Sequence, residues 1–517
     1  MTQPGDGRTE GALPPPAGMT GPVLAGGAWT SANILLPYVL TSLVSIVAAR
    51  VLGPAEMGRQ SFIAFVTLAG TIACSAGLPL ALTRSLGESL GQGTRAALPG
   101  LVRRAWLVET PLALVGMTVL LVAAAAGAEP RAAWALAALT VLAGSLATVP
   151  QAALAGALEW KAYAIVVLWA NVAVTGLTLA ALAAGFGITG IVAARLVQTA
   201  AMAIWTSFAL RSMLRRTAPD PVRSPPAERR MVRYAAGSSL SVILMLIVYQ
   251  RSELFFLNHF SPDAEIAHYA IASSALTILL AVPQAIGVAL TPAFSSLHGA
   301  GQLIRIRIGF SKALRVSGLG VVVLLGLAAT VGPPLIVAVY GDAYREVQTV
   351  FLILLPTLLA APLIAVSSAV LVSHGLVRAP LLAVGAAAIV DLLAAYLLVP
   401  RYGAPGAAGA NLAALTVAAT LQLAYALRVV RSVDVDIACL LRAVLASGLA
   451  TVGGLAVVRL LPGPLDLLVA LLVFVLLLSA SARALGIARV DDARWLTAFA
   501  QRAHPRAGRI LSFVLLR

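Results

Sequence analysis

The chain has 517 residues, of which 60% are hydrophobic and only 11% are charged. Its mean hydropathy is +0.95. Soluble domains carry about 25% charged residues, so this composition excludes an ordinary soluble protein. The formal net charge of +16 does not indicate a nucleic-acid partner, because the basic residues lie in short loops between apolar runs. That arrangement is typical of membrane topology signals.

The N-terminal stretch 1–22 is rich in Pro and Gly, and we expect it to be a disordered tail. Apolar runs long enough to cross a bilayer, which takes about 20 residues each, then recur along the chain. They predict about fourteen helices. Their expected limits are 27–50, 59–84, 104–126, 132–156, 163–184, 188–210, 233–258, 265–296, 313–340, 347–373, 379–399, 405–427, 439–461 and 465–485.

The polar stretch 214–230, which contains four prolines, is the longest break in this pattern. We therefore expect a six-helix N-terminal bundle at 23–213, a cytoplasmic linker at 214–230 and a second six-helix bundle at 231–430. Two additional helices at 431–485 and a basic cytoplasmic tail at 486–517 follow.

The distribution of basic residues predicts the orientation in the membrane. If both termini are cytoplasmic, 28 of the 36 Lys and Arg residues fall in or beside loops on the inside. Short cytoplasmic loops carry an excess of Lys and Arg. We therefore expect a multi-pass protein of the cell (inner or plasma) membrane with both termini in the cytoplasm.

Two sequence patterns repeat between the halves. The segment 186–196, FGITGIVAARL, recurs at 402–412 as YGAPGAAGANL, and GPAEMG at 53–58 resembles SPDAEIA at 261–267. Because each half has an even number of spans, the repeats must be parallel, related by an axis along the membrane normal. Duplication of this kind is typical of secondary transporters, whose substrate path lies between the halves.

Four motifs carry a resemblance to a known family. They are ARVLGPAEMG at 49–58, GLPLALTR at 77–84, YGDAY at 340–344 and YGAPGAA at 402–408. With them the chain resembles, from about 27 to 430, the multidrug/oligosaccharidyl-lipid/polysaccharide (MOP) flippase superfamily, and within it the polysaccharide-export and O-antigen flippase branch. The two additional C-terminal helices look like those of fourteen-span members that flip a lipid-linked peptidoglycan precursor.

The resemblance implies an all-α fold, in which two six-helix bundles form a V. It also implies a flippase that moves an undecaprenyl-pyrophosphate-linked oligosaccharide from cytoplasm to periplasm by alternating access. Its expected partners are that lipid-linked substrate, membrane lipids, and the glycan polymerase and glycosyltransferases of polysaccharide biosynthesis. The alternatives are a cation-coupled multidrug exporter of the same superfamily and a membrane polysaccharide polymerase or ligase.

Arginines within or beside spans are the candidates for cargo binding. Ionisable groups there cost about 2.5–3.5 kcal/mol on insertion scales, and guanidinium pairs well with phosphate oxygens. Arg195 and Arg251 are expected to border a cleft between the halves, and Arg84 and Arg50 lie near helix ends. The structural alternatives are that Arg50 snorkels or caps a helix and that Arg84 is a topology charge. Asn411 stands where Arg195 stands in the first repeat, so the fold does not require Arg there.

Three carboxylates in predicted spans are candidates for coupling transport to an ion gradient: Glu253, Asp391 and Glu109. The structural alternative for each is a satisfied hydrogen bond between helices. Two distant cysteines, Cys74 and Cys439, lack the spacing of metal ligands. There is no Walker motif, and we expect no cofactor, no metal and no enzymatic activity.

Overall fold

The computed structural model describes residues 20–157, 159–217, 224–431, 437–460 and 466–486. In these ranges all regular elements are helical. The α-helices are α1 (Thr20–Ser75), α2 (Leu78–Gly91), α3 (Leu98–Ala125), α4 (Arg131–Gly156), α5 (Trp160–Ala183), α6 (Gly187–Thr217), α7 (Pro225–Tyr249), α8 (Glu253–Phe260), α9 (Asp263–Gly299), α10 (Leu303–Tyr340), α11 (Val347–Leu354), α12 (Thr357–Ser373), α13 (Arg378–Val430), α14 (Ile437–Leu460) and α15 (Asp466–Ala484). Short 3₁₀ helices precede α3 (η1, Arg95–Ala97) and α11 (η2, Asp342–Tyr344).

The described residues include twelve helical segments long and apolar enough to cross a membrane. Two of the helices, α1 and α13, have 56 and 53 residues and are each interrupted by a kink. Counted as two crossings each, they bring the total to the fourteen that the sequence predicts. The all-α fold class is therefore confirmed.

Glycine makes both kinks. Gly53 in α1 has a φ of 74° and Gly403 in α13 a φ of 58°, in the left-handed region where side chains with a Cβ are disfavoured. Both glycines belong to the motifs that repeat between the halves. The chain reverses at each of these glycines, and each is the one non-helical residue inside its helix. The other residues of the predicted loops at 51–58 and 400–404 are helical.

The structure also explains the aromatic-Gly-x-x-Gly repeat. Gly187, the counterpart of Gly403, has a φ of 53°. The second glycine of each copy permits a close approach. A Cβ on Gly190 would overlap Ala181, and one on Gly406 would overlap the Leu398 carbonyl. The repeat is therefore a tight turn between two helices.

Three spans predicted as continuous helices are wrong in that respect, because each is divided into two helices by a short break. The span predicted at 59–84 is interrupted at residues 76–77, the one at 233–258 at 250–252, and the one at 347–373 at 355–356. Ala76 and Arg251 have φ values of 38° and 64°, while Pro356 stands at the N-cap of α12. The predicted linker is also shorter, since α6 continues to Thr217 and α7 starts at Pro225. The predicted tails at 1–22 and 486–517 lie almost wholly outside the described residues.

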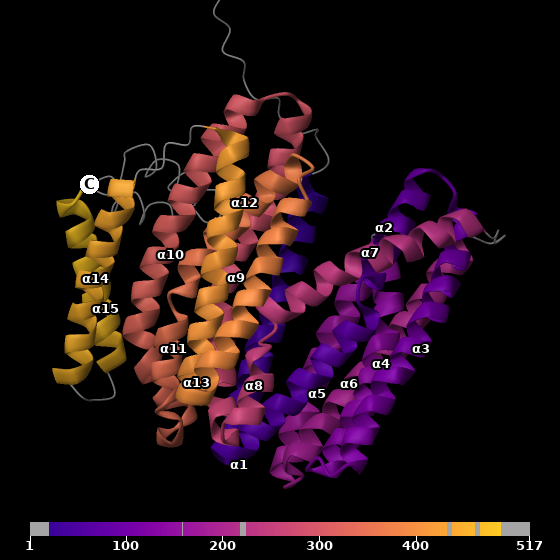
Figure 1. Ribbon diagram of the computed structural model, residues 1–517, viewed down its shortest axis with the longest axis horizontal. Coiled ribbons are helices and arrows are strands. Elements are labelled where there is room, and N and C mark those ends of the chain that lie inside the picture. The colour runs from indigo at the N-terminus through magenta and orange to yellow at the C-terminus, as the bar shows by residue number, and fades with distance from the viewer. Residues whose placement is uncertain (1–19, 158, 218–223, 432–436, 461–465, 487–517) are drawn as a thin grey trace, which may run out of the picture.

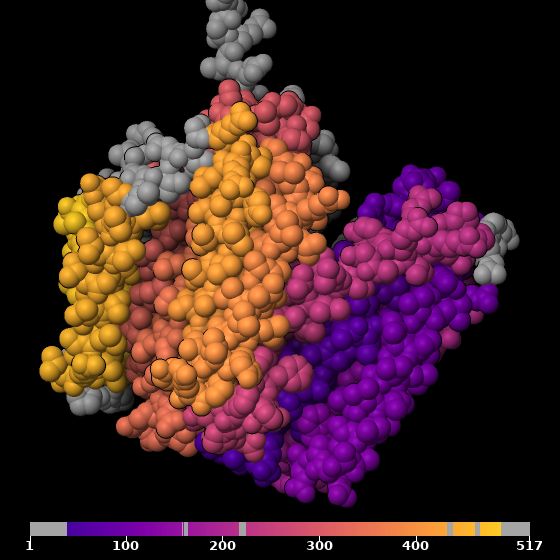
Figure 2. All heavy atoms as spheres, viewed as in Figure 1, coloured from indigo at the N-terminus to yellow at the C-terminus, as the bar shows by residue number. Residues whose placement is uncertain are grey.

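The helices form two lobes arranged as a V (Figure 1). The N-lobe contains α2–α6, and the C-lobe contains α8–α13. The lobes meet at the narrow end, where α3, α5, α8 and α10 end. They diverge at the wide end, where α2, α6, α9 and α12 end, and a wedge opens between them there (Figure 2). Helix α7 crosses from α2 and α3 to α13, and α1 packs on α4 and α5 as well as on α9.

A buried apolar cluster joins the lobes at and above the narrow end. Ala49, Met57 and Phe65 of α1 pack there with residues of α9, α10, α11 and α13. The Tyr344 hydroxyl donates a hydrogen bond of 2.7 Å to the Ala49 carbonyl, and both groups are buried. Burial of apolar surface and of this polar pair holds the two repeats together at the narrow end.

The two C-terminal helices pack against the outside of the C-lobe (Figure 1). Ser447 of α14 donates a hydrogen bond of 2.9 Å to the Val322 carbonyl of α10. A Cβ on Gly326 would overlap the Ser447 hydroxyl, so α14 approaches α10 closely at this glycine. Small residues and interhelical hydrogen bonds of this kind drive helix association in membranes.

Candidate functional site

The C-lobe contains a buried polar centre beside the break between α7 and α8. Ser252 donates a hydrogen bond of 2.8 Å to Asp391 Oδ2. Asn411 Nδ2 donates one of 2.9 Å to Glu253 Oε1. Both carboxyl groups are fully buried. The broken helix thus brings two acids from α8 and α13 together with an amide from the second repeat motif.

The centre has unused hydrogen-bonding capacity. Glu253 Oε2 and Asp391 Oδ1 are buried and lack a hydrogen bond of good geometry among the described residues. The two carboxyl groups interact electrostatically with one another, and the Tyr269 ring lies beside both. Two buried acids so close cannot both be ionised without a compensating positive charge. Arg251, which interacts with Glu253, a shared proton or a bound cation would supply that charge.

Arg251 lies at the break and not on a helix. Its Nη2 donates a hydrogen bond of 3.1 Å to Ser274 of α9. Arg251 and Glu253 therefore do not lie on one continuous helix, as the predicted span 233–258 implied, because residues 250–252 are not helical. Arg251 instead interacts electrostatically with Glu253.

Arg195 lies on α6, away from this centre. Its Nη1 donates a hydrogen bond of 2.8 Å to Gln198 Oε1, one turn further on. Gln198 in turn contacts Asn171 of α5 at 3.4 Å. The residue is exposed on the surface of the protein, whereas Gln198 is buried. Arg195 is therefore a cation on the surface of the N-lobe, hydrogen-bonded to the buried Gln198.

Arg84 and Arg50 occupy opposite ends of the molecule. Arg84 of α2 pairs with Glu88 at 2.7 Å, and its guanidinium lies 4.6 Å from the centre of the Tyr234 ring of α7. Arg50 donates hydrogen bonds of 2.7 and 2.9 Å to the Val339 and Ala338 carbonyls in the last turn of α10. Arg50 thus caps a helix at the narrow end, which favours its structural alternative.

Glu109 is the buried acid of the N-lobe. It accepts a hydrogen bond of 2.7 Å from Ser75, the last residue of α1. The Thr148 hydroxyl lies 3.3 Å from that of Ser75. Glu109 therefore stands beside another broken helix, but with no second acid reported near it in the described residues. Its contacts match the structural alternative of an interhelical hydrogen bond.

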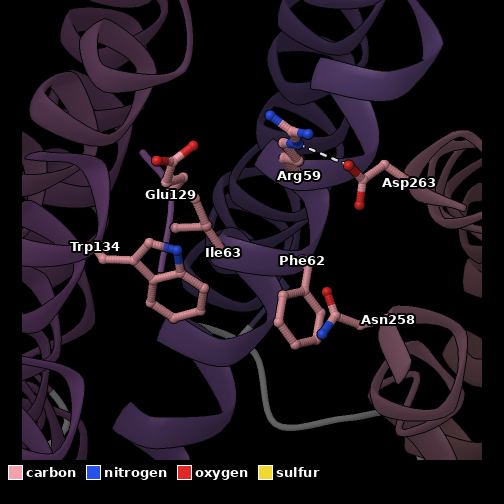
Figure 3. A pocket seen from close by; sticks show the side chains of 7 residues that line it. All are labelled: Arg59, Phe62, Ile63, Glu129, Trp134, Asn258 and Asp263. Atoms are coloured by element: carbon pink, nitrogen blue, oxygen red, sulfur yellow. Dashed lines mark hydrogen bonds and ion pairs between the residues drawn. The ribbon is translucent and has the colours of Figure 1, made fainter. Parts of the chain in front are cut away.

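An ion pair closes the narrow end between the lobes. Arg59 of α1 pairs with Asp263, the first residue of α9, at 2.6 Å. A Cβ on Gly58 would overlap the Asp263 carbonyl oxygen, so the two backbones nearly touch. Figure 3 shows the pair above a small pocket. The residues lining this pocket come from both lobes: Arg59, Phe62, Ile63, Glu129, Trp134, Asn258 and Asp263.

Several of these residues were not predicted from the sequence. Ser252, Tyr269 and the pair Arg59–Asp263 are ordinary in sequence and gain their roles only from helices that are distant in the chain. The repeats did carry a signal. Glu265 in SPDAEIA accepts a hydrogen bond of 2.7 Å from the Ala404 N–H of the other repeated motif, so the two patterns are parts of one structural unit.

The chain is similar to a known protein family and to several solved structures of transporters. A family described as polysaccharide biosynthesis protein matches residues 47–349. A search of curated proteins gave no match. Among solved structures, the lipid II flippase MurJ in an inward closed conformation has a TM-score of 0.67 at 13% identity. The similar region covers 88% of this chain and 99% of the MurJ chain.

A multidrug resistance MATE family transporter of the MOP superfamily, in its inward-facing conformation, has a TM-score of 0.64 at 16% identity. The similar region covers 77% of this chain and 97% of the MATE transporter chain. A MOP superfamily transporter from Pyrococcus furiosus has a TM-score of 0.53 at 15% identity, over 76% and 95% of the two chains. The family match therefore assigns the chain to the polysaccharide biosynthesis protein family, and its fold is similar to that of transporters of the MOP superfamily.

Proposed function

We propose that this protein flips an undecaprenyl-pyrophosphate-linked oligosaccharide from the cytoplasmic to the outer leaflet of the cell membrane, for polysaccharide biosynthesis. The family match over 47–349 carries the proposal, because the fold by itself is shared with drug exporters. The helices α14 and α15 add support, since the lipid II flippase MurJ aligns with a larger share of this chain than the MATE transporter does.

The proposed direction depends on which end faces the cytoplasm. Basic residues of the described chain gather at the wide end: Arg95, Arg103, Arg104, Arg211, Arg215, Arg216, Arg229, Arg230, Arg305, Arg307, Arg378 and Arg428. Acidic residues gather at the narrow end: Glu56, Glu129, Asp263, Asp342 and Glu346. The positive-inside rule places the wide end in the cytoplasm. The wedge would then be open to substrate on its cytoplasmic side.

Cargo recognition would rest on fixed cations. The Arg195 guanidinium donates a hydrogen bond to Gln198 and the Arg251 guanidinium donates one to Ser274, and each guanidinium has five N–H donors. The remaining donors suit a pyrophosphate, and charge-assisted hydrogen bonds contribute roughly 1.5–3 kcal/mol each. Arg84, at the wide end, would attract the anionic head group at the entrance.

The centre formed by Glu253 and Asp391 would couple transport to an ion gradient. Intramembrane acids mark ion and proton paths in transporters, and broken helices supply the coordinating groups of such sites. A monovalent cation or a proton bound there would neutralise one of the two negative charges. Its release would favour rearrangement of α8 and α13, and with them of α7, which packs on α13 and on α2 and α3 of the N-lobe.

Glycan analysis in a strain that lacks the gene tests the proposal. Lipid-linked units should accumulate on the inner leaflet and return to normal with the wild-type gene. Arg195→Ala and Arg251→Ala should restore export poorly, although both variants insert in the membrane. Accumulation on the outer leaflet would indicate a polymerase or ligase instead. Unchanged glycans together with lost resistance to cationic dyes would indicate a drug exporter.

A further inference from the structure

One histidine at the narrow end is buried without partners of good geometry. His268 lies in the second turn of α9 and is only 4% exposed. Neither of its ring nitrogens makes a hydrogen bond among the described residues. Buried polar groups of native proteins are nearly always hydrogen-bonded, so this ring needs an explanation.

Two carboxylates face the same ring nitrogen. Glu346 Oε2 lies 3.4 Å from His268 Nδ1, and Glu265 Oε1 lies 3.9 Å from it. The three ligand atoms all lie within 4.8 Å of one another. Glu265 and His268 are three residues apart and therefore share a face of α9. Glu346 reaches them from the turn between η2 and α11.

We propose that Glu265, His268 and Glu346 bind a divalent transition metal of the zinc class. Zinc bonds to His nitrogen and carboxylate oxygen are about 2.0–2.2 Å long, in tetrahedral geometry, which places ligand atoms about 3.3 Å apart. The distance from Nδ1 to Glu346 already fits, whereas Glu265 must move closer to Nδ1, and the two carboxylate oxygens, which lie within 4.8 Å of each other, must also come closer together. An imidazole ligand selects zinc, cobalt or nickel over magnesium and calcium, which prefer oxygen.

The surroundings suit a metal with an open position. His268 and Glu346 line an open pocket of about 560 Å³, which has room for a water ligand. Arg345 also lines this pocket, but its charge is offset by Asp342 at 2.8 Å. Glu265 Oε2 accepts the Ala404 N–H, which orients the other oxygen of this carboxylate toward the ring. Such hydrogen bonds to a ligand fix its geometry.

The site belongs to one repeat only. The aligned segment of the first half reads Glu56-x-x-Arg59, so an arginine stands where the second half has His268. Arg59 pairs with Asp263, two residues before Glu265. The same position of the repeat thus supplies an ion pair between the lobes in one half and a metal ligand in the other. The metal would bind beside the contact that closes the narrow end.

Cobalt binding tests the proposal, because four-coordinate Co²⁺ absorbs visible light. The full chain, purified in detergent without a polyhistidine tag, is titrated with Co²⁺. The wild-type protein should bind one equivalent with an intense visible band, and one equivalent of Zn²⁺ should remove that band. Glu346→Gln should lose it. Because the Glu346 side chain is 75% exposed, this change should not disturb folding, which its melting temperature without metal checks.

Two control variants separate this site from others. Glu56→Gln removes the corresponding carboxylate of the first repeat, and His298→Ala breaks a histidine pair at the wide end whose ring centroids are 4.3 Å apart. Both should keep the wild-type band. A wild-type protein that binds no cobalt would overturn the proposal. So would a Glu346→Gln variant with an unchanged band, or loss of the band in His298→Ala alone.

Discussion

At the scale of single residues, the buried acids decide what the C-lobe can do. Glu253 and Asp391 are held by Asn411 and Ser252, yet each retains a buried oxygen without a hydrogen bond of good geometry. Glu109 is a single acid that accepts a hydrogen bond from Ser75, and its other oxygen is likewise buried without a hydrogen bond of good geometry. In the pair, an added proton or cation relieves the repulsion between two acids as well as the cost of burying them, whereas at Glu109 it relieves the cost of burial alone. The two lobes therefore differ in chemistry although their backbones repeat.

Replacing one acid of the pair should remove its response to cations. Glu253→Gln keeps the shape and the Asn411 contact but removes a charge, so a cation no longer gains by binding there. The melting temperature of the wild-type protein should rise when sodium replaces a large organic cation, or with falling pH if a proton is the ligand. This rise should vanish in Glu253→Gln and persist in Glu109→Gln. An equal response in all three proteins would exclude the site.

Arg251 combines a charge with a left-handed backbone, and two substitutions separate these properties. Arg251→Ala removes the guanidinium and leaves a Cβ at a φ of 64°. Arg251→Gly also relieves the backbone, which costs on the order of 1–3 kcal/mol for residues other than glycine. We expect Gly to melt higher than Ala, with export impaired in both. Normal export by the glycine variant would show that the charge is not needed.

At the scale of elements, apolar run length was enough to predict where the chain crosses the membrane, but not where helices break. The runs predict the number of crossings because backbone groups in lipid must be satisfied within each helix. The break at 250–252 has no glycine or proline to mark it; the buried acids and tertiary contacts around Arg251 compensate for it. Pro356 does mark a break, but Pro111, Pro150 and Pro283 lie within continuous helices.

The candidate site was predictable only in part for the same reason. Intramembrane charge identifies Glu253 and Asp391 from sequence, since charged groups are costly in lipid. Their partners are Ser252 and Asn411, and neutral residues carry no such signal. Arg50 is also a candidate by its charge, but its hydrogen bonds to the last turn of α10 favour the structural alternative.

Because α1 and α9 approach closely at Gly58, we expect a larger residue at this position to destabilise their contact. Gly58→Ala would place a Cβ against the Asp263 carbonyl, a rigid backbone group. Overpacking of this kind costs typically about 1–3 kcal/mol, so the melting temperature should fall and the narrow end should loosen. A cysteine at Asp263 should then react faster with an impermeant maleimide added from outside. Gly176→Ala, with open space around it, should change neither quantity.

At the scale of the whole molecule, the lobes are joined at one end and separated at the other (Figure 2). The pseudo-symmetric repeats place GPAEMG and SPDAEIA against each other, where Arg59 meets Asp263 (Figure 3). The closing contacts at the narrow end are an ion pair and an apolar cluster. Transport by alternating access requires that these contacts open while the wide end closes, with α7 continuous between the lobes.

A reversible cross-link at the narrow end tests this requirement. In a protein whose Cys74 and Cys439 are replaced by alanine, Arg59→Cys and Asp263→Cys are joined by a short, reducible bis-thiol reagent in cells. Delivery of lipid-linked sugar to the outer leaflet is measured before and after reduction. We predict that cross-linking stops delivery and that reduction restores it, while either single cysteine variant continues to export. Full delivery by completely cross-linked protein would contradict transport through a path that opens between the lobes.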